Sequence, residues 1–126
     1  MNINEMKVLV CDDSILSRKK LKDSIIALGC KEVFEAADGE EAVIKYKETN
    51  PDVVFMDIVM PKKDGIEAVK EILAFDPSAK IVMASSVGTQ QFLKDAIKAG
   101  ASDFLQKPLD NDQVKRLLDN FCKEGE

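Results

Sequence analysis

Short apolar runs alternate along the chain with longer segments whose apolar residues recur at helical spacing. The runs lie at residues 8–11, 33–34, 53–56, 81–84 and 104–105. The first, third and fourth are nearly uninterrupted, as is typical of strands covered on both faces, so we expect them to be central strands. Glu32 and Glu35 border the second run, which predicts an edge strand with one face in water.

Between these runs the apolar residues keep to one face of a helix. The stripes are Leu21, Ile25 and Leu28; Ala42, Val43 and Tyr46, the weakest; Ile66, Val69 and Leu73; Leu93, Ala96, Ile97 and Gly100; and Val114, Leu117, Leu118 and Phe121. This three- and four-residue spacing predicts amphipathic helices. Helix breakers such as Gly29, Pro51 and Pro77 separate the segments.

Strict alternation of five strands and five helices predicts an α/β fold built from βα units with right-handed crossovers and a parallel sheet. Five units are too few to close an eight-stranded barrel, so we expect an open, doubly wound sheet with helices on both faces. In such sheets ligands bind beyond the carboxyl ends of the strands. The residues that follow each strand are therefore the candidates for chemistry.

Acidic residues follow two of the predicted central strands. The first strand leads into Asp12 and Asp13, and the third ends at Asp57. A lone acid here is equally well explained as a helix N-cap, a role open to Asp13 or Ser14. Three neighbouring carboxylates would repel one another unless a cation lay among them. A small set of oxygen ligands fits Mg²⁺, which keeps several waters and is usually completed by a phosphate.

The fourth and fifth strands bring a hydroxyl and an ammonium group to the same edge. Ser85 follows the fourth, and Lys107 with Pro108 follows the fifth. Taken singly, Ser85 is a loop residue and Lys107 a solvated charge, but matching positions favour a shared site. A proline here also permits a cis bond, whose presence the sequence does not decide. A carboxylate nucleophile beside a cation, a hydroxyl and a Lys suits the transfer of a phosphoryl group onto aspartate.

Composition narrows the class of protein. The 126 residues, 45% hydrophobic and 33% charged, predict one domain over residues 1–126. A chain of this length can form a core that needs no disulfide or metal ion for stability. Lys and Arg number 18 against 23 Asp and Glu, which argues against a nucleic-acid partner. The chain begins without a signal peptide and contains no apolar run long enough to span a membrane, so we expect a cytoplasmic protein without membrane insertion.

Several residue types and motifs are missing. The sequence has no histidine, which excludes histidine-based nucleophile systems and phosphohistidine. Cys11, Cys30 and Cys122 form no CxxC pair, so we expect buried thiols rather than zinc ligands or disulfides. There is also no glycine-rich phosphate loop of the Rossmann or P-loop kind.

Taken together, these motifs resemble the receiver domains of two-component response regulators. The resemblance runs from about residue 7 to 121 and rests on residues 12–13, 56–57, 60–65, 84–86 and 100–108. It implies a flavodoxin-like sheet of strand order 2-1-3-4-5. It further implies that Asp57 is the phosphoacceptor and that Asp12, Asp13, Asp57 and the backbone carbonyl of Val59 hold Mg²⁺.

The same resemblance assigns roles to the remaining site residues. Ser85 and Lys107 would contact oxygens of the phosphoryl group, and Phe104 stands at the family's aromatic switch position. Since its ring carries no hydroxyl, a switch here would work by burial alone, unless Phe104 is simply a core residue. Val59 and Val87 flank the phosphoryl site, and their apolar side chains predict slow self-dephosphorylation, unless they only pack under the loops and leave the path of the attacking water open.

Only residues 123–126 follow the last helix, so we expect a receiver without an output domain, acting as a monomer. By resemblance it is not an enzyme but assists its own phosphorylation by a histidine kinase and its slow dephosphorylation, to which a phosphatase could add. Stand-alone receivers commonly dock on a protein target such as the flagellar switch in chemotaxis, here through a surface around Lys94, Lys98, Phe104 and Lys115.

Three other interpretations remain at this point. One is a phosphorelay intermediate of the sporulation type. Another is a phosphatase of the haloacid dehalogenase type, which needs a second Asp where this chain has Val59, a residue that cannot donate a proton. The last is an interaction module that has lost its chemistry, although the acids, the hydroxyl and the Lys are all present.

Overall fold

The computed structural model describes residues 1–85, 90–107 and 109–124, and it describes only the backbone of Ser85, Gln90, Phe92 and Leu93. Its strands are β1 (Lys7–Cys11), β2 (Glu32–Ala36), β3 (Val53–Asp57), β4 (Ile81–Ser85) and β5 (Asp103–Gln106). Its helices are α1 (Ile15–Ala27), α2 (Gly39–Thr49), α3 (Gly65–Phe75), α4 (Gln90–Ala99) and α5 (Asn111–Glu124), preceded by a 3₁₀ turn, η1 (Ile3–Glu5).

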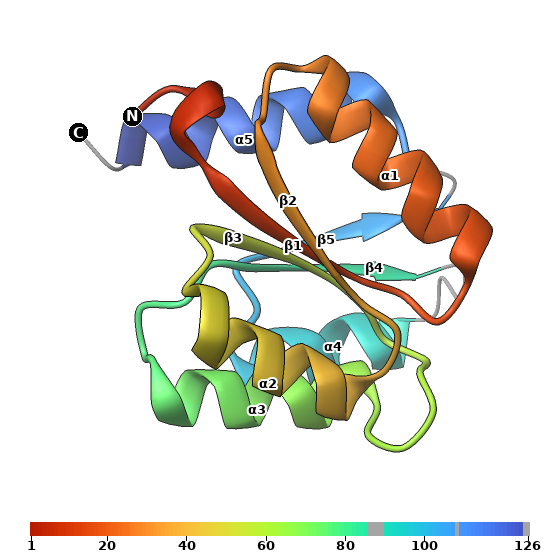
Figure 1. Ribbon diagram of the computed structural model, residues 1–126. Helices are drawn as coiled ribbons and strands as arrows, with labels where there is room; N and C mark the ends of the chain where they lie inside the picture. The colour runs from red at the N-terminus through yellow and green to blue at the C-terminus, as the bar shows by residue number, and fades with distance from the viewer. Residues whose placement is uncertain (86–89, 108, 125–126) are drawn as a thin grey trace.

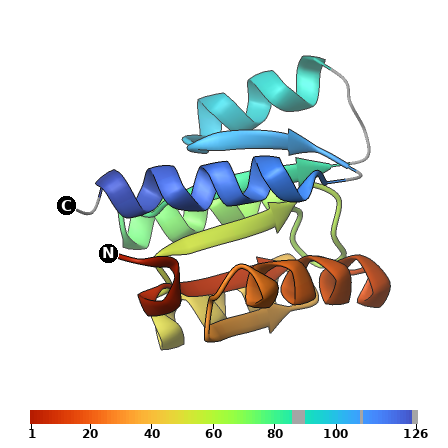
Figure 2. The same ribbon diagram turned by 90° about the horizontal axis from the view of Figure 1, so that it is seen from above.

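All strand pairings are parallel, and the five strands lie in the order β2-β1-β3-β4-β5. The arrowheads in Figure 2 accordingly point to one edge of the sheet. β1, β3 and β4 are the inner strands, and β2 and β5 form the edges. The predicted α/β class, the central strands and the implied strand order are thus confirmed.

Two layers of helices cover the sheet, as Figure 1 shows: α1 and α5 lie on one face, and α2, α3 and α4 on the other. Alternate residues of a strand point to opposite faces. In β1, Leu9 therefore joins the core under α2, α3 and α4, whereas Val8 and Val10 join the core under α1 and α5. Because both faces are buried, the inner strands are apolar at successive positions.

Capping residues set where three helices begin. Ser14, Asp38 and Asp64 each accept a hydrogen bond from the backbone N–H three residues later, at 3.2, 2.8 and 2.9 Å. These bonds satisfy amide groups that the first turn of a helix leaves without partners. Ser14, rather than Asp13, is thus the N-cap of α1, and the Asp13 carboxylate is left for another role.

The helical stripes differ in how far they are buried. Ile25, Val69, Val114 and Leu118 are buried as predicted. In α4, Ala96 is fully buried but Ile97 is 62% exposed, so the expectation that Ile97 faces the core is wrong. One residue corresponds to about 100° of helical turn, and with Ala96 against the sheet the next side chain turns toward water.

The three cysteines are divided between the two cores, one on each face of the sheet. Cys11 lies in the core under α2, α3 and α4, whereas Cys30 and Cys122, the latter a residue of α5, belong to the core on the opposite face. Burial raises the pKa of the Cys11 thiol and that of the Cys30 thiol. Both groups are therefore held as thiols at neutral pH. Among the described residues, no helix combines the length and the apolar character needed to cross a membrane.

Candidate functional site

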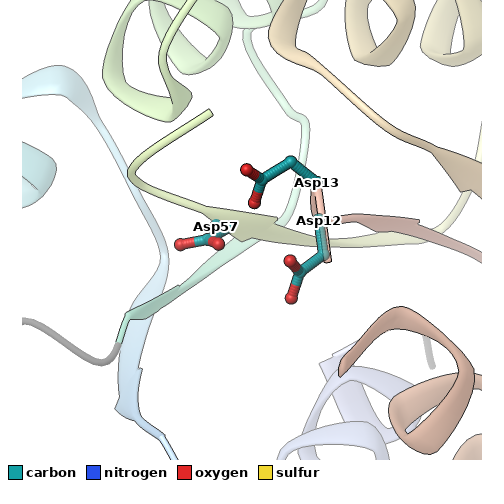
Figure 3. A group of neighbouring side chains, drawn as sticks. All are labelled: Asp12, Asp13 and Asp57. Carbon is teal, nitrogen blue, oxygen red and sulfur yellow. The ribbon is translucent and has the colours of Figure 1, made fainter. Parts of the chain in front are cut away.

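Three aspartates meet at the carboxyl edge of the sheet. Cys11 of β1 pairs with Met56 of β3, so the residue after each, Asp12 and Asp57, is carried to the same point. One oxygen from each of Asp12, Asp13 and Asp57 lies within 4.8 Å of the others. Figure 3 shows the three carboxylates gathered at the ends of the two neighbouring strands. The predicted cluster is therefore formed.

Asp12 is buried, and all of its polar groups are engaged. Its carboxylate accepts from the backbone N–H of Ser14 at 2.9 Å and from the Lys107 ammonium at 2.6 Å. Its backbone N–H donates to the carbonyl of Ala36, and its own carbonyl accepts from the Arg18 guanidinium at 2.7 Å. Asp12 is thus held by four other parts of the chain.

Asp57 is largely buried and Asp13 is exposed. The pKa of the Asp57 carboxyl is raised, first by burial and then by the charge of Asp12, which together outweigh the Lys107 ammonium and the backbone N–H of Val59. A carboxylate whose pKa is raised in this way is short of positive charge. The cluster consequently favours the arrival of a cation.

Lys107 supplies the positive charge that the site already contains. Its ammonium lies 2.6 Å from a carboxylate oxygen of Asp12 and 3.4 Å from one of Asp57. Burial lowers the pKa of Lys107, but the hydrogen bond from its ammonium to Asp12 and the charges of both acids outweigh that effect and raise it. The ammonium group predicted at this edge therefore lies between Asp12 and Asp57.

The other predicted residues are placed less fully. Ser85 closes β4 opposite Gln106 of β5, which brings its backbone to the same edge, while its side chain lies outside the described part of the structure. Val87 and Pro108 are likewise outside the described residues. Val59 is 55% exposed, and Phe104 is half-buried against the core under α2, α3 and α4.

A cleft of about 700 Å³ opens over the acids. Asp12, Asp57 and Lys107 line it at the sheet, and Leu21 of α1 and Asn111 of α5 are among the residues that line it beyond. Pockets of this size hold small ligands. The cleft thus adjoins Asp12, Asp57 and Lys107, whereas Asp13 is not among the residues that line it.

The aspartates suit a divalent cation of the hard type. They offer only carboxylate oxygens, and few of them, as Mg²⁺ sites do when water and phosphate complete the coordination. Zinc is not favoured, since it prefers nitrogen and sulfur ligands and the only thiol beside the cluster, that of Cys11, is buried with a raised pKa. Receiver-type magnesium binding is therefore compatible with Asp12, Asp13 and Asp57.

Arg18 and Glu35 contact this site but do not stand out in the sequence. Arg18 donates to the carbonyl of Asp12 and, at 3.2 Å, to the carboxylate of Glu35, which also accepts from Lys22 at 3.1 Å. In the sequence Arg18 belongs to a short basic triplet that suggests no role. The one available signal is an arginine four residues after the N-cap, beside an acid on an edge strand.

Known proteins share this fold and these motifs. The model of the response regulator receiver domain family matches residues 8–119. The chemotaxis protein CheY of Thermotoga maritima is 47% identical over 117 residues, covering 93% of this chain and 98% of that protein. CheY of Bacillus subtilis is 47% identical over 112 residues, covering 89% and 93%.

Solved structures of receiver proteins have the same fold as this chain. The CheX-CheY-BeF3-Mg²⁺ complex of Borrelia burgdorferi superposes with a TM-score of 0.85 at 43% identity over 92% of this chain and 89% of that one. A Pseudomonas aeruginosa histidine kinase receiver domain with magnesium coordinated in its active-site cleft has a TM-score of 0.85 at 25% identity, covering 92% and 96%. Family match, near-complete coverage and shared topology all lead to one conclusion: the chain belongs to the response regulator receiver domain family, as a receiver of the CheY-like chemotaxis type.

Proposed function

We propose that this protein is phosphorylated on Asp57 by a partner histidine kinase, with Mg²⁺ held by Asp12, Asp13, Asp57 and the backbone carbonyl of Val59. The observation that carries the proposal is the meeting of three carboxylates within 4.8 Å beside the Lys107 ammonium. The chain acts as a single receiver domain over residues 1–126, in the cytoplasm and as a monomer.

Each side chain has a task in the transfer. A carboxylate oxygen of Asp57 attacks the phosphorus of a phosphohistidine, forming the aspartyl phosphate as the phosphorus–nitrogen bond breaks and the imidazole nitrogen takes the bonding electrons. Lys107, whose ammonium lies beside Asp57 in the unphosphorylated protein, pairs with one phosphoryl oxygen, and the Ser85 hydroxyl donates to another. A bound Mg²⁺ supplies charge neutralisation for the same oxygens.

The raised pKa of Asp57 agrees with this role. A more basic carboxylate is a better nucleophile, provided that it is ionised at the working pH. Burial and the Asp12 charge raise the pKa of Asp57, while Lys107 limits the rise. The two effects therefore act in opposite directions on the same carboxyl, and the net result is a raised pKa.

Apolar side chains beside the acids offer a surface for the partners that deliver or remove the phosphoryl group. Ile15 and Leu16, which open α1 just after the acidic pair, are 75% and 66% exposed, and Val59 is 55% exposed. Exposed apolar groups close to a reactive site are typical of protein contacts. The CheX-CheY complex of Borrelia burgdorferi shows that a similar receiver assembles with another protein.

For the output we propose a separate surface, formed by α4, β5 and α5 around Lys94, Lys98, Phe104 and Lys115, that docks on a target such as the flagellar switch. Similarity to CheY proteins supports this chemotaxis role over that of a phosphorelay intermediate. Self-dephosphorylation is slow, and a separate phosphatase accelerates it.

Intact-mass measurement tests the phosphoacceptor. After incubation with Mg²⁺ and a small-molecule phosphodonor, we expect one added phosphoryl group on the wild type and none on Asp57→Asn. The matched control is Asp119→Asn, which changes an acid of the ion pair with Lys115 on α5 and should be labelled normally. Equal labelling of Asp57→Asn, or no adduct on the wild type with either a small phosphodonor or a phosphorylated kinase, would contradict the proposal.

A further inference from the structure

The Arg18 guanidinium joins three elements directly behind the acidic cluster. It projects from the first turns of α1, donates through Nη1 to the backbone carbonyl of Asp12 at 2.7 Å, and donates through Nε to Glu35 of β2 at 3.2 Å. Its side chain is only 16% exposed. An arginine bound at two points of its planar head is fixed in orientation as well as in position.

The bond to the Asp12 carbonyl acts on Asp13. The carbonyl of Asp12 and the backbone N–H of Asp13 belong to one rigid peptide plane, which ends at the Cα of Asp13. At the start of this plane Asp12 is already tied by its N–H to Ala36 and by its carboxylate to Ser14 and Lys107. Holding the carbonyl oxygen therefore fixes the N–Cα bond of Asp13, and the bond from the Ser14 N–H to Asp12 restrains the peptide on the other side of Asp13. Together the two bonds limit the directions in which the Asp13 side chain leaves the backbone.

Asp13 has the greatest need of such support. It is the exposed member of the cluster, whereas Asp12 and Asp57 are held by burial and by Lys107. Mg²⁺ demands nearly ideal octahedral geometry, so a ligand that wanders binds it poorly.

We propose that Arg18 is a positioning residue for the cation site: by clamping the Asp12 carbonyl it aims Asp13 at the cation, and Glu35 holds Arg18 in place. This inference rests on the proposed magnesium-dependent function. The inferred role is unusual in one respect, since the charge of Arg18 itself repels the cation that the proposed site would bind.

Because Arg18 is positively charged, the direction of the change in Mg²⁺ affinity when it is removed tests the inference. If Arg18 acted only through its charge, removing it would relieve repulsion and tighten Mg²⁺ binding. If Arg18 aims a ligand, removing it loosens the ligand and weakens binding. The two accounts thus predict opposite changes in the same dissociation constant.

Isothermal titration of the full chain with Mg²⁺ at fixed ionic strength makes the measurement. We expect Arg18→Ala to weaken binding roughly tenfold, within the range found when an outer-shell partner of a metal ligand is removed. The matched control is Lys22→Ala, which also removes a cation from Glu35 but has no bond to Asp12. It should change the constant by less than about twofold, as expected for a partly exposed ion pair.

Calcium provides a second readout. Because Ca²⁺ accepts flexible geometry, Arg18→Ala should weaken Ca²⁺ binding less than Mg²⁺ binding, so that the preference between the ions shifts. Circular dichroism at the titration temperature checks that each variant is folded. Should Arg18→Ala fail to fold, Arg18→Lys keeps the charge without the two-point clamp and should weaken Mg²⁺ binding by a smaller factor.

The outcomes are distinct. Weaker Mg²⁺ binding by the folded Arg18 variant, with the Lys22 control unchanged, supports the inference. Unchanged or tighter binding overturns it while leaving the proposed function intact. Equal weakening in the Lys22 control overturns it as well. A wild type that does not bind Mg²⁺ refutes the proposed function and the inference with it.

Discussion

The balance of charge at the carboxyl edge depends on single side chains, and Asp57 is the least favourably placed. Burial and the Asp12 charge raise the pKa of its carboxyl, so the folded chain binds this proton more tightly than the unfolded chain does. Stability is therefore unaffected by Asp57 below the unfolded pKa of about 4 and falls as the pH rises through the higher folded value. Above the folded pKa, the ionised group destabilises the fold.

Removing that charge should stabilise the metal-free protein. We expect Asp57→Asn to raise the free energy of unfolding at pH 7 in EDTA by about 1 kcal/mol, a rise in Tm of roughly 3–5 °C for a domain of this length. Thermal unfolding followed by circular dichroism measures it. The gain should shrink as the pH falls and should vanish well below the unfolded pKa of about 4, where both states of the wild type are protonated. A gain independent of pH would contradict this account.

Val59 controls a different property, the lifetime of the phosphoryl group. Its side chain is apolar and 55% exposed two residues after Asp57, where it offers nothing that could hold an attacking water. We expect Val59→Asn to accelerate phosphate release roughly tenfold, equivalent to about 1.4 kcal/mol in the activation barrier. The decay of the phosphorylated mass after removal of the phosphodonor gives the rate. Ile44→Asn, an exposed change on α2, is the control and should leave the rate as it was.

Sequence reasoning identified the acids and Lys107 for a specific reason. Parallel strands end at a common edge, so residues that follow them meet whatever the details of packing. Arg18 and Glu35 lie on a helix and an edge strand whose relative register no periodicity encodes. The bonds from Arg18 to Asp12 and to Glu35 depend on how α1 packs against β2, so they could not have been predicted.

At the scale of elements, the first residue of two helices has no space for a side chain. α2 and α3 each begin with an Asp N-cap followed by a glycine, Gly39 and Gly65. A Cβ at Gly39 would overlap the backbone carbonyl of Lys63, and a Cβ at Gly65 would overlap that of Asp57. Both glycines are thus required for space, not for a left-handed backbone.

This pair allows a comparison of matched variants. Gly65→Ala and Gly39→Ala should each lower the free energy of unfolding by about 1–3 kcal/mol, measured in urea, because the backbone must shift to make room. Only Gly65→Ala displaces the backbone of the phosphoacceptor, so only it should slow phosphorylation by a small phosphodonor. Equal slowing in both variants would show that the effect is a general loss of stability.

The apolar spacing located both α4 and α5, but in α4 it did not give the orientation of every residue in the stripe. In α5, Val114 and Leu118 are buried one turn apart, as the spacing indicated. In α4, burial of the small Ala96 sets the rotation of the helix and turns Ile97 to water. A pattern of apolar residues does not reveal which of two neighbours will face the sheet, because packing decides it.

At the scale of the whole molecule, the site lies at the carboxyl edge of the sheet, and the proposed output surface extends from that edge along α4, β5 and α5. We expect a phosphoryl analogue with Mg²⁺ to shift backbone resonances in α4, β5 and α5, including Lys94, Phe104 and Lys115, as the half-buried Phe104 ring moves inward. NMR chemical-shift mapping is the measurement, with Asp57→Asn as the variant that should not respond. Shifts confined to α2 and α3 would contradict this output surface.

The layered architecture followed from the sequence, but the order of the strands did not. Alternating patterns predicted a parallel α/β sheet with β1, β3 and β4 inside, because only strands covered on both faces are apolar at successive positions. Several orders satisfy that pattern, and the order 2-1-3-4-5 came from the resemblance to receiver domains. The cleft over the acids likewise required the packing of α1 and α5.

Because Cys11 and Cys30 lie in the cores on opposite faces of the sheet, their modification can report separately on the unfolding of each helical layer. Cys11 is sealed beneath α2, α3 and α4, and Cys30 beneath α1 and α5, and burial suppresses the thiolate form of both. An alkylating reagent can reach either thiol only when the overlying layer detaches. The rates at which Cys11 and Cys30 are alkylated under native conditions can be compared. Equal rates would indicate that both helical layers open in one global unfolding step, and different rates would indicate that one layer unfolds before the other.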